Sequence, residues 1–272
     1  RPNFLMADKV LRTVLCPVSK LANARLLLML LVALSLSLYV LNAEALYEAF
    51  TEFDREDSAS VAVLWGEGGA FSAGWDLKQA AAIDNDHFFE AHDMPKDNSE
   101  APPALLGPTR LELDKPVIAA IAGPAVAGGM ELALWCDFRV MEASAYFGVY
   151  CRRWGIPLID GGTVRLPRLV GEGRAREIIL TGRRVDAEEC LSIGLCEYVV
   201  EEGACRDKAE VLAHEIAAHP QVCVRADRRS VNNQHGNSLR EALTFEWHNG
   251  RDALFQEGIR GAGQFANPSG NK

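Results

Sequence analysis

The sequence of 272 residues has little positive charge and few aromatic side chains. Lys and Arg number 28 against 37 Asp and Glu, which gives a formal net charge of −9. A nucleic-acid partner requires clustered Lys and Arg that neutralise phosphates, so this charge argues against one. The basic cluster of Arg225, Arg228 and Arg229 has Asp227 between its members and is interpreted as a solvated helix face. With 49% hydrophobic residues, the composition predicts a globular chain with a substantial core.

Paired cysteine motifs and metal-ligand spacings are also lacking. The seven cysteines are odd in number and none forms a C-x-x-C pair, so neither a disulfide framework nor a zinc site is indicated. We therefore expect an intracellular location, in the cytoplasm or the mitochondrial matrix. His214 and His219 in "HEIAAH" lie five residues apart, whereas the zinc-peptidase pattern needs four. The sequence predicts no metal site.

The longest uncharged apolar run, at residues 26–41, reads "LLLMLLVALSLSLYVL". It is shorter than the roughly 20 residues that a membrane-spanning helix needs. Three interpretations are open: a buried helix, a signal-type apolar region or a short membrane anchor. The next residues, "NAEALYEAFTEF", keep a helical period and favour the buried helix. Only the anchor would imply contact with a membrane.

Apolar, β-branched stretches alternate with helical patterns from residue 60 onward. Residues 60–65 ("SVAVLW") and 115–123 ("KPVIAAIAG") predict buried strands. Asp76 is placed to cap a helix through "LKQAAAI", and residues 84–108, rich in proline, predict a long mobile loop. From Cys205 to Gln256 we expect amphipathic helices. Strands with intervening helices predict an α/β core followed by a helical C-terminal region.

Two stretches share the order strand, small-residue turn, helix start. They are "SVAVLWGEGGAFSAGWDLK" and "PVIAAIAGPAVAGGMELA". Adjacent glycines at a helix start cost stability, so they suggest a place where bare backbone approaches a ligand. Helix starts carry free N–H groups, and two convergent N–H donors can form an oxyanion hole. A single carboxylate, Glu131, follows the second turn.

Four motifs together resemble the crotonase, or enoyl-CoA hydratase/isomerase, superfamily: "FSAGWDLK", "KPVIAAIAGPAVAGGMELALWCD", "GGTVRLPRLVG" and "LTGRRVDAEECLSIGLCEYVV". The resemblance covers roughly residue 59 to the C-terminus. It implies an α/β fold with a crotonase-like repeated ββα spiral core at 46–205, which binds acyl-CoA. A divergent apolar segment, 1–45, would precede this core, and the family's first strand is not recognisable there. The helical region 206–272 would build a homotrimer or homohexamer.

The resemblance also implies the site. The backbone N–H groups of Trp75 and Gly128 would bind the thioester carbonyl of an acyl-CoA, and Glu131 would move protons. Lys78 lies where the family contacts the phosphates of coenzyme A, which enters as part of the substrate, so no separate cofactor is expected. The other residues expected to contact substrate are Ala73 and Cys151. Simpler roles stay open: Glu131 as a partner of the helix dipole, Asp76 as a cap and Lys78 as a surface residue.

The family's hydratases carry a second glutamate at the position that Cys151 occupies here. A thiol is a poor base near neutral pH. If a second proton-transfer group exists, we expect it to be Asp160, which could instead cap the helix of "GGTVRLPRLVG". The consequence would be weak hydration of enoyl-CoA, with isomerisation, C–C hydrolysis or another enolate reaction favoured.

Two other functions compete with this hypothesis. "AFSAG" nearly matches the G-x-S-x-G pattern, which would make Ser72 the nucleophile of a serine hydrolase, although no HGGG-type loop accompanies it. The second is a coenzyme A-binding relative that has lost turnover, because Cys151 replaces a catalytic glutamate.

Overall fold

The computed structural model describes residues 40–83, 86–97 and 99–267. The strands are β1 (Ala62–Trp65), β2 (Val117–Ile121), β3 (Pro124–Val126), β4 (Phe138–Glu142), β5 (Tyr146–Gly148), β6 (Arg184–Asp186) and β7 (Tyr198–Val200). The helices are α1 (Val40–Arg55), α2 (Leu77–Ala80), α3 (Asp86–Ala91), α4 (Gly128–Trp135), α5 (Gly162–Val170), α6 (Glu172–Thr181), α7 (Ala187–Ser192), α8 (Cys205–Ala218), α9 (Gln221–Asn233), α10 (Leu239–Ala253) and α11 (Ile259–Ala266). Shorter turns are η2 (Pro108–Arg110), η3 (Tyr150–Trp154) and the π-helical η4 (Leu254–Gly258).

A parallel sheet with the strand order β1-β2-β4-β7 forms the centre of the fold. Every residue of β2, "VIAAI", is buried, as expected for a parallel strand that is covered on both faces. A second sheet has the order β3-β5-β6, in which β3 and β5 are parallel and β6 runs antiparallel to β5. The chain passes from the first sheet to the second in the short turn between β2 and β3. Because β3 leads into α4, the two sheets are linked close to the start of α4.

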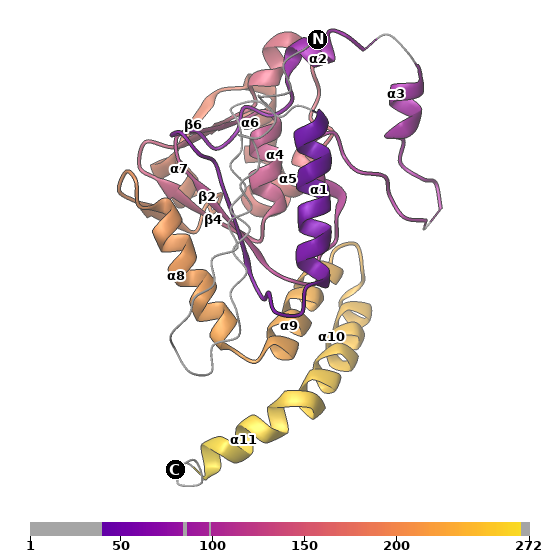
Figure 1. Ribbon diagram of the computed structural model, residues 1–272, viewed down its shortest axis with the longest axis vertical. Coiled ribbons are helices and arrows are strands. Elements are labelled where there is room, and N and C mark those ends of the chain that lie inside the picture. Colours follow the sequence, from indigo (N-terminus) through magenta and orange to yellow (C-terminus); the bar gives the residue numbers. More distant parts are fainter. Residues whose placement is uncertain (1–39, 84–85, 98, 268–272) are drawn as a thin grey trace, which may run out of the picture.

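The side chains of β1 alternate between two apolar clusters, as the period of two in a strand requires. Ala62 and Leu64 belong to the larger cluster, which also contains Leu46 and Phe50 of α1. Val63, together with Val61 just before the strand, belongs to the smaller cluster, against α8. Figure 1 shows α8 on one side of the strands and α1 and α4 on the other. The predicted α/β core is therefore built as a layered structure.

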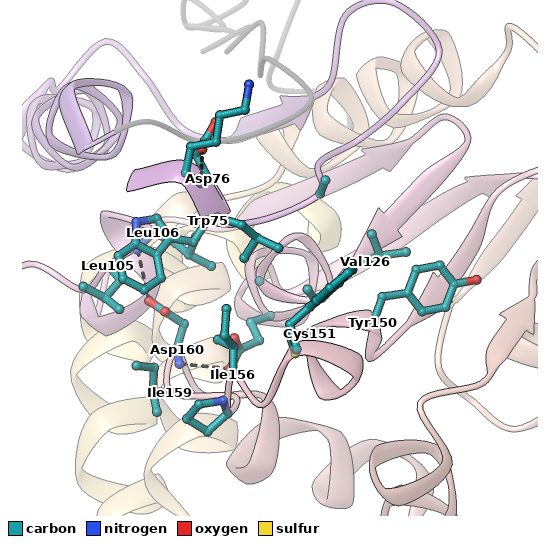
Figure 2. Close-up of a pocket in the computed structure, with 18 residues that line it drawn as sticks. Trp75, Asp76, Leu105, Leu106, Val126, Tyr150, Cys151, Ile156, Ile159 and Asp160 are labelled. Carbon is teal, nitrogen blue, oxygen red and sulfur yellow. Dashed lines mark hydrogen bonds between the residues drawn. The ribbon is translucent and has the colours of Figure 1, made fainter. Parts of the chain in front are cut away.

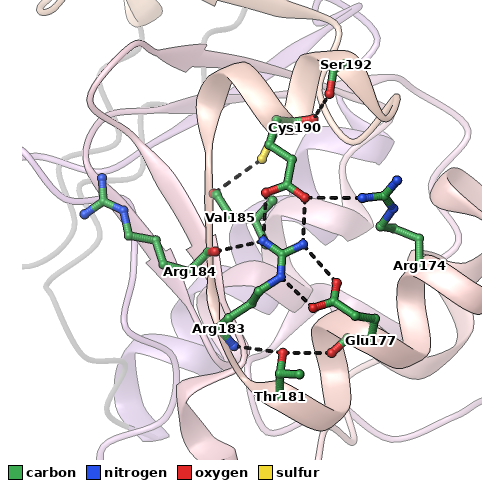
Figure 3. A network of polar contacts seen from close by, with 9 residues as sticks. Arg174, Glu177, Thr181, Arg183, Arg184, Val185, Cys190 and Ser192 are labelled. Carbon is green, nitrogen blue, oxygen red and sulfur yellow. Dashed lines mark hydrogen bonds and ion pairs between the residues drawn. The ribbon is translucent and has the colours of Figure 1, made fainter.

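An ion-pair network centred on Arg183 of the motif "LTGRRVDAEE" holds α6, β6 and α7 together. The Arg183 guanidinium donates to both carboxylate oxygens of Glu177 and to both of Glu189, at 2.6–2.9 Å. Arg174 reaches Glu189 at 3.5 Å (Figure 3). Single exposed ion pairs contribute little, whereas this bidentate network fixes the relative positions of three elements.

The region 84–108 differs from the long loop that was predicted. Residues 86–91 form α3, and Ala104 pairs with Gly107 in an isolated bridge. Phe88 on α3 stacks on Trp75 with ring centroids 5.9 Å apart, so an apolar contact that the proline content does not reveal stabilises this helix. In contrast, α2 ends at Ala80 and is shorter than predicted.

The basic cluster on α9 is not a solvated face, so that interpretation was wrong. Arg228 donates to Asp137 at 2.7 Å and to the carbonyl of Leu113, and Arg229 pairs with Asp114. These bonds attach α9 to the body of the fold. The cationic side chains are therefore used in intramolecular contacts.

The apolar run 26–41 lies outside the described residues apart from Val40 and Leu41, which begin α1. Farther along α1, Phe50 and Phe53 are buried in the core. Within the described ranges, none of the helices combines the length and the apolar character needed to cross a membrane. The division into segments 1–45, 46–205 and 206–272 stays a prediction, and α8, almost all of which falls in the last of these, packs on the central sheet.

Candidate active site

A cavity of about 370 Å³ lies beside the two turns that precede α2 and α4. Apolar side chains from the 104–107 turn and the 154–159 segment form much of its wall (Figure 2). The structure brings all of the predicted site residues to this one cavity: Ala73, Trp75, Lys78, Gly128, Glu131, Cys151 and Asp160.

The turns before α2 and α4 are in close contact through glycine. Gly74 has a positive φ of 81°. A Cβ at Gly74 would lie 2.6 Å from the backbone nitrogen of Gly128. A Cβ at Gly128 would lie 2.7 Å from Leu106 Cδ1. The adjacent glycines thus allow two backbone segments to approach, and they bring Trp75 and Gly128 to the same cavity.

Glu131 lies in the first turn of α4 and is only 3% exposed. Its Oε1 accepts hydrogen bonds from the backbone N–H groups of Asp160 and Gly162, both at 2.9 Å. Burial, and secondly the negative charge of Asp160, raise the pKa of Glu131 to about 7. A carboxyl group with this pKa can both accept and donate a proton near neutral pH. The helix dipole alone would account for neither the burial nor the raised pKa.

Asp160 lies on the same wall and does not cap α5. That helix begins at Gly162, its N-cap is Gly161, and no side chain bonds to the cap, so the capping alternative was wrong. Instead, Asp160 Oδ1 accepts hydrogen bonds from Leu106 N at 3.2 Å and from Thr109 Oγ1 at 2.7 Å. Burial raises the pKa of Asp160, and the Thr109 hydrogen bond opposes that rise.

Cys151 lies on η3 and is buried in the cavity wall. Burial, and then the charge of Glu131, raise the pKa of the thiol. The thiol therefore stays protonated near neutral pH. A protonated thiol cannot act as a base in place of a glutamate.

The cavity is also lined by Trp75, Asp76 and Lys78. Asp76 caps α2 by accepting hydrogen bonds from Lys78 N at 2.7 Å and Gln79 N at 3.3 Å, as predicted. The Lys78 side chain is exposed. This exposure suits either of its proposed roles, contact with a phosphate or simple solvation.

Ser72 does not line the cavity. The residue is fully buried, and its hydroxyl accepts a hydrogen bond from Gly74 N at 3.1 Å. A hydrolase nucleophile must be accessible to its substrate. The burial of Ser72 therefore argues against the serine-hydrolase alternative.

Several residues of the site were not predicted from the sequence. They include Leu105, Leu106 and Tyr150, which line the cavity, and Thr109, which bonds to Asp160. For Leu105 and Leu106 the signal available was the proline-rich composition of 84–108, which indicated only a loop, and no pattern indicated Thr109 or Tyr150. Among the residues described, no group of three or more His, Cys, Asp or Glu side chains could hold a metal ion.

Comparison with known proteins gives concordant matches. A family model described as enoyl-CoA hydratase/isomerase matches residues 36–266. YngF of Bacillus subtilis, named as an enoyl-CoA hydratase/isomerase, is 38% identical over 198 residues, which cover 72% of each chain. Carnitinyl-CoA dehydratase of Citrobacter koseri is 38% identical over 187 residues, or 66% of each chain.

The structure of enoyl-CoA hydratase from Bacillus anthracis superposes with a TM-score of 0.78 and 31% sequence identity, covering 92% of this chain and 95% of that one. The predicted fold class is confirmed by this match. The relatives named here are bacterial, so they give no support to a mitochondrial location. The intracellular location stays a prediction.

Proposed function

The chain belongs to the enoyl-CoA hydratase/isomerase family, and from that premise we propose that it is an enzyme that processes acyl-CoA thioesters through an enolate. One observation carries the proposal. A buried carboxyl group, Glu131, has its pKa raised to about 7 and lies in the wall of a cavity beside two glycine-rich turns.

In this proposal the thioester oxygen binds between the N–H groups of Trp75 and Gly128. Gly128 is the first residue of α4, so its N–H has no acceptor within the helix. Donors placed where negative charge develops stabilise an enolate, and removal of one such donor typically costs about 10²- to 10³-fold in kcat. The close approach of Gly74 to Gly128 supports this arrangement, because it brings the two turns together.

Glu131 is proposed to transfer the proton at the substrate carbon next to the thioester. With Oε1 held by two N–H donors, Oε2 is the oxygen available to substrate. Asp160 is proposed as the second proton-transfer group. It lines the same cavity, and its own backbone N–H is bonded to Glu131.

The positions of these acids support a proposal for the reaction class. Cys151 cannot serve as the second base, so we expect weak simple hydration and favour isomerisation or another enolate reaction. A second candidate is dehydration of a β-hydroxyacyl-CoA, in which Asp160 would protonate the leaving hydroxyl. Because dehydration is the reverse of hydration, this candidate predicts that wild type also hydrates the matching enoyl-CoA and that Asp160→Asn does not. The presence of two carboxyl groups in one cavity, and the similarity to a carnitinyl-CoA dehydratase, favour this candidate.

The test is a screen of the purified protein against enoyl-, β-hydroxy- and β-ketoacyl-CoA thioesters, comparing wild type with Asp160→Asn and Cys151→Glu. We expect low hydratase activity in wild type, loss of the preferred reaction in Asp160→Asn, and a gain of hydratase activity in Cys151→Glu. Strong wild-type hydration that survives Asp160→Asn would contradict the role of Asp160. A protein that binds these thioesters and converts none of them would be the inactive relative.

We also propose that the chain assembles as a homotrimer or homohexamer through its C-terminal helices. Large apolar side chains are exposed there: Val231, Leu239, Leu243, Trp247, Leu254, Phe255, Ile259 and Phe265. A surface of this kind typically marks an interface. Light scattering that finds only a monomer at micromolar concentration would contradict the proposal.

A further inference from the structure

The two carboxyl groups of the cavity are held in the same way. Glu131 Oε1 accepts two hydrogen bonds, from Asp160 N and Gly162 N. Asp160 Oδ1 also accepts two, from Leu106 N and Thr109 Oγ1. Within the described part of the chain, neither Glu131 Oε2 nor Asp160 Oδ2 receives a hydrogen bond. Both side chains line the cavity, so each has one fixed oxygen and one oxygen left for a ligand.

The two groups differ in the source of their donors. Both donors to Glu131 belong to the backbone, whereas one of the donors to Asp160 is the hydroxyl of Thr109. Thr109 is 2% exposed and lies on η2, outside the cavity lining. A hydroxyl has a single proton to donate, and this one points to Asp160.

The two neighbouring arginines, Arg165 and Arg110, donate to backbone carbonyl oxygens and not to the Asp160 carboxylate. Arg165 of α5 donates to the carbonyl oxygens of Asp160 at 3.1 Å and Thr109 at 2.7 Å, so its guanidinium orders the backbone of both residues. Arg110 of η2 donates to His92 O at 2.8 Å. The negative charge of Asp160 also acts on Glu131 of α4, and the thiol of Cys151 on η3 lines the same cavity.

We propose that Thr109 is a positioning residue for proton transfer: its hydroxyl holds Asp160 Oδ1 and so turns Oδ2 toward the substrate. This inference rests on the proposed function. Asp160 accepts a proton from the substrate at Oδ2, becomes a neutral acid and returns the proton to the substrate later in the cycle, so the carboxylate is regenerated. The same hydrogen bond stabilises the ionised form of Asp160 and opposes the effect of burial on its pKa.

The test compares Thr109→Val, which removes the hydroxyl at nearly constant shape, with Thr109→Ser, which retains it. For Thr109→Val we expect kcat to fall about tenfold, with KM within about twofold of wild type because Thr109 does not line the cavity. Loss of the hydrogen bond raises the pKa of Asp160. The acidic limb of the kcat–pH profile contains the ionisation of Glu131, near pH 7, and that of Asp160, and the Asp160 part should therefore move to higher pH. Thr109→Ser should restore the wild-type profile.

A purely structural role for Thr109 would lower the melting temperature of Thr109→Val and leave its pH profile in place, and that result overturns the inference. If Thr109→Val does not fold, Thr109→Cys supplies a weak thiol donor in a small side chain. Its acidic limb should move in the same direction, and an unmoved limb overturns the inference as well. The proposed function fails separately if wild type converts no acyl-CoA. If wild type is active and Asp160→Asn loses turnover but Thr109→Val keeps the wild-type profile, only the inference about Thr109 fails.

Discussion

The cavity region buries charged side chains, whereas the C-terminal helices expose apolar ones. Around the cavity, buried polar groups such as Glu131 and Asp160 each have two hydrogen-bond donors. On the C-terminal helices, large apolar groups face solvent: Leu239 is 77% exposed and Phe265 is 90% exposed. Figure 1 shows α10 and α11 extending away from the rest of the chain. The cavity is therefore assembled within one chain, whereas the C-terminal surface has the character of an interface.

The largest expected effect comes from Glu131→Gln, which removes the proton-transfer group and keeps its shape. We expect kcat on the preferred thioester to fall by at least about 10²-fold, because general acid–base catalysis contributes about 10²- to 10⁴-fold. The dissociation constant for acyl-CoA, measured by calorimetry, should stay close to that of wild type. Unchanged turnover would remove Glu131 from the mechanism.

The raised pKa of Glu131 also predicts a dependence of stability on pH. The folded protein binds a proton at Glu131 up to pH about 7, whereas the unfolded chain releases it near 4.5, the ordinary pKa of a glutamate. The free energy of unfolding should therefore fall as pH rises from 4.5 to 7, by about 3 kcal/mol for this group. Denaturant titrations over this range check it. In Glu131→Gln the fall should be smaller by that amount, and an equal fall in both proteins would contradict the raised pKa.

A substitution at Gly74 tests the contact between the turns that precede α2 and α4. Gly74→Ala would place a Cβ 2.6 Å from Gly128 N, at a positive φ. We expect about 2 kcal/mol of destabilisation, measured by chemical denaturation, together with loss of turnover. The matched control is Gly173→Ala on α6, where a Cβ meets nothing within 4 Å. Equal stability of the two variants would show that the turns do not need their close approach.

Much of the site could be predicted because its residues lie in motifs that resemble the crotonase family, and two of these motifs join a strand to the start of a helix. Ala73 and Trp75 lie between β1 and α2, and Gly128 and Glu131 lie at the start of α4 after β3. Each motif therefore includes both the turn and the helix start that form its part of the site. Thr109 and Asp160 could not be paired in this way, because 51 residues separate them and neither lies in a pattern that indicates the contact.

The basic cluster was misread for the same reason. Asp137, the partner of Arg228, lies 91 residues away, and Asp114, the partner of Arg229, lies 115 residues away. Charge patterning reports only on neighbours along a helix. The interpretation of a solvated face therefore failed where tertiary contacts decide which charges are paired.

Substitutions of exposed residues on the C-terminal helices are expected to have the smallest effect on the stability of the fold. Leu239, Leu243 and Trp247 follow one another at intervals of four residues on α10, so they share one face. Trp247→Lys should dissociate the assembly in sedimentation experiments and change the monomer's free energy of unfolding by less than about 0.5 kcal/mol. Val211→Lys on α8, also exposed, is the control that should leave the assembly intact. An unaltered sedimentation coefficient for Trp247→Lys would exclude this face from the interface.

The most direct test of the central claim, that Glu131 moves a proton on a bound acyl-CoA, is isotope exchange. Purified protein is incubated near pH 7 in D₂O with a saturated acyl-CoA, and deuterium at the carbon next to the thioester is followed by mass spectrometry. Wild type should exchange that hydrogen well above the uncatalysed rate, and Glu131→Gln should reduce the exchange by at least about 10²-fold. Exchange at the background rate in wild type, or equal exchange in the two proteins, would contradict the claim.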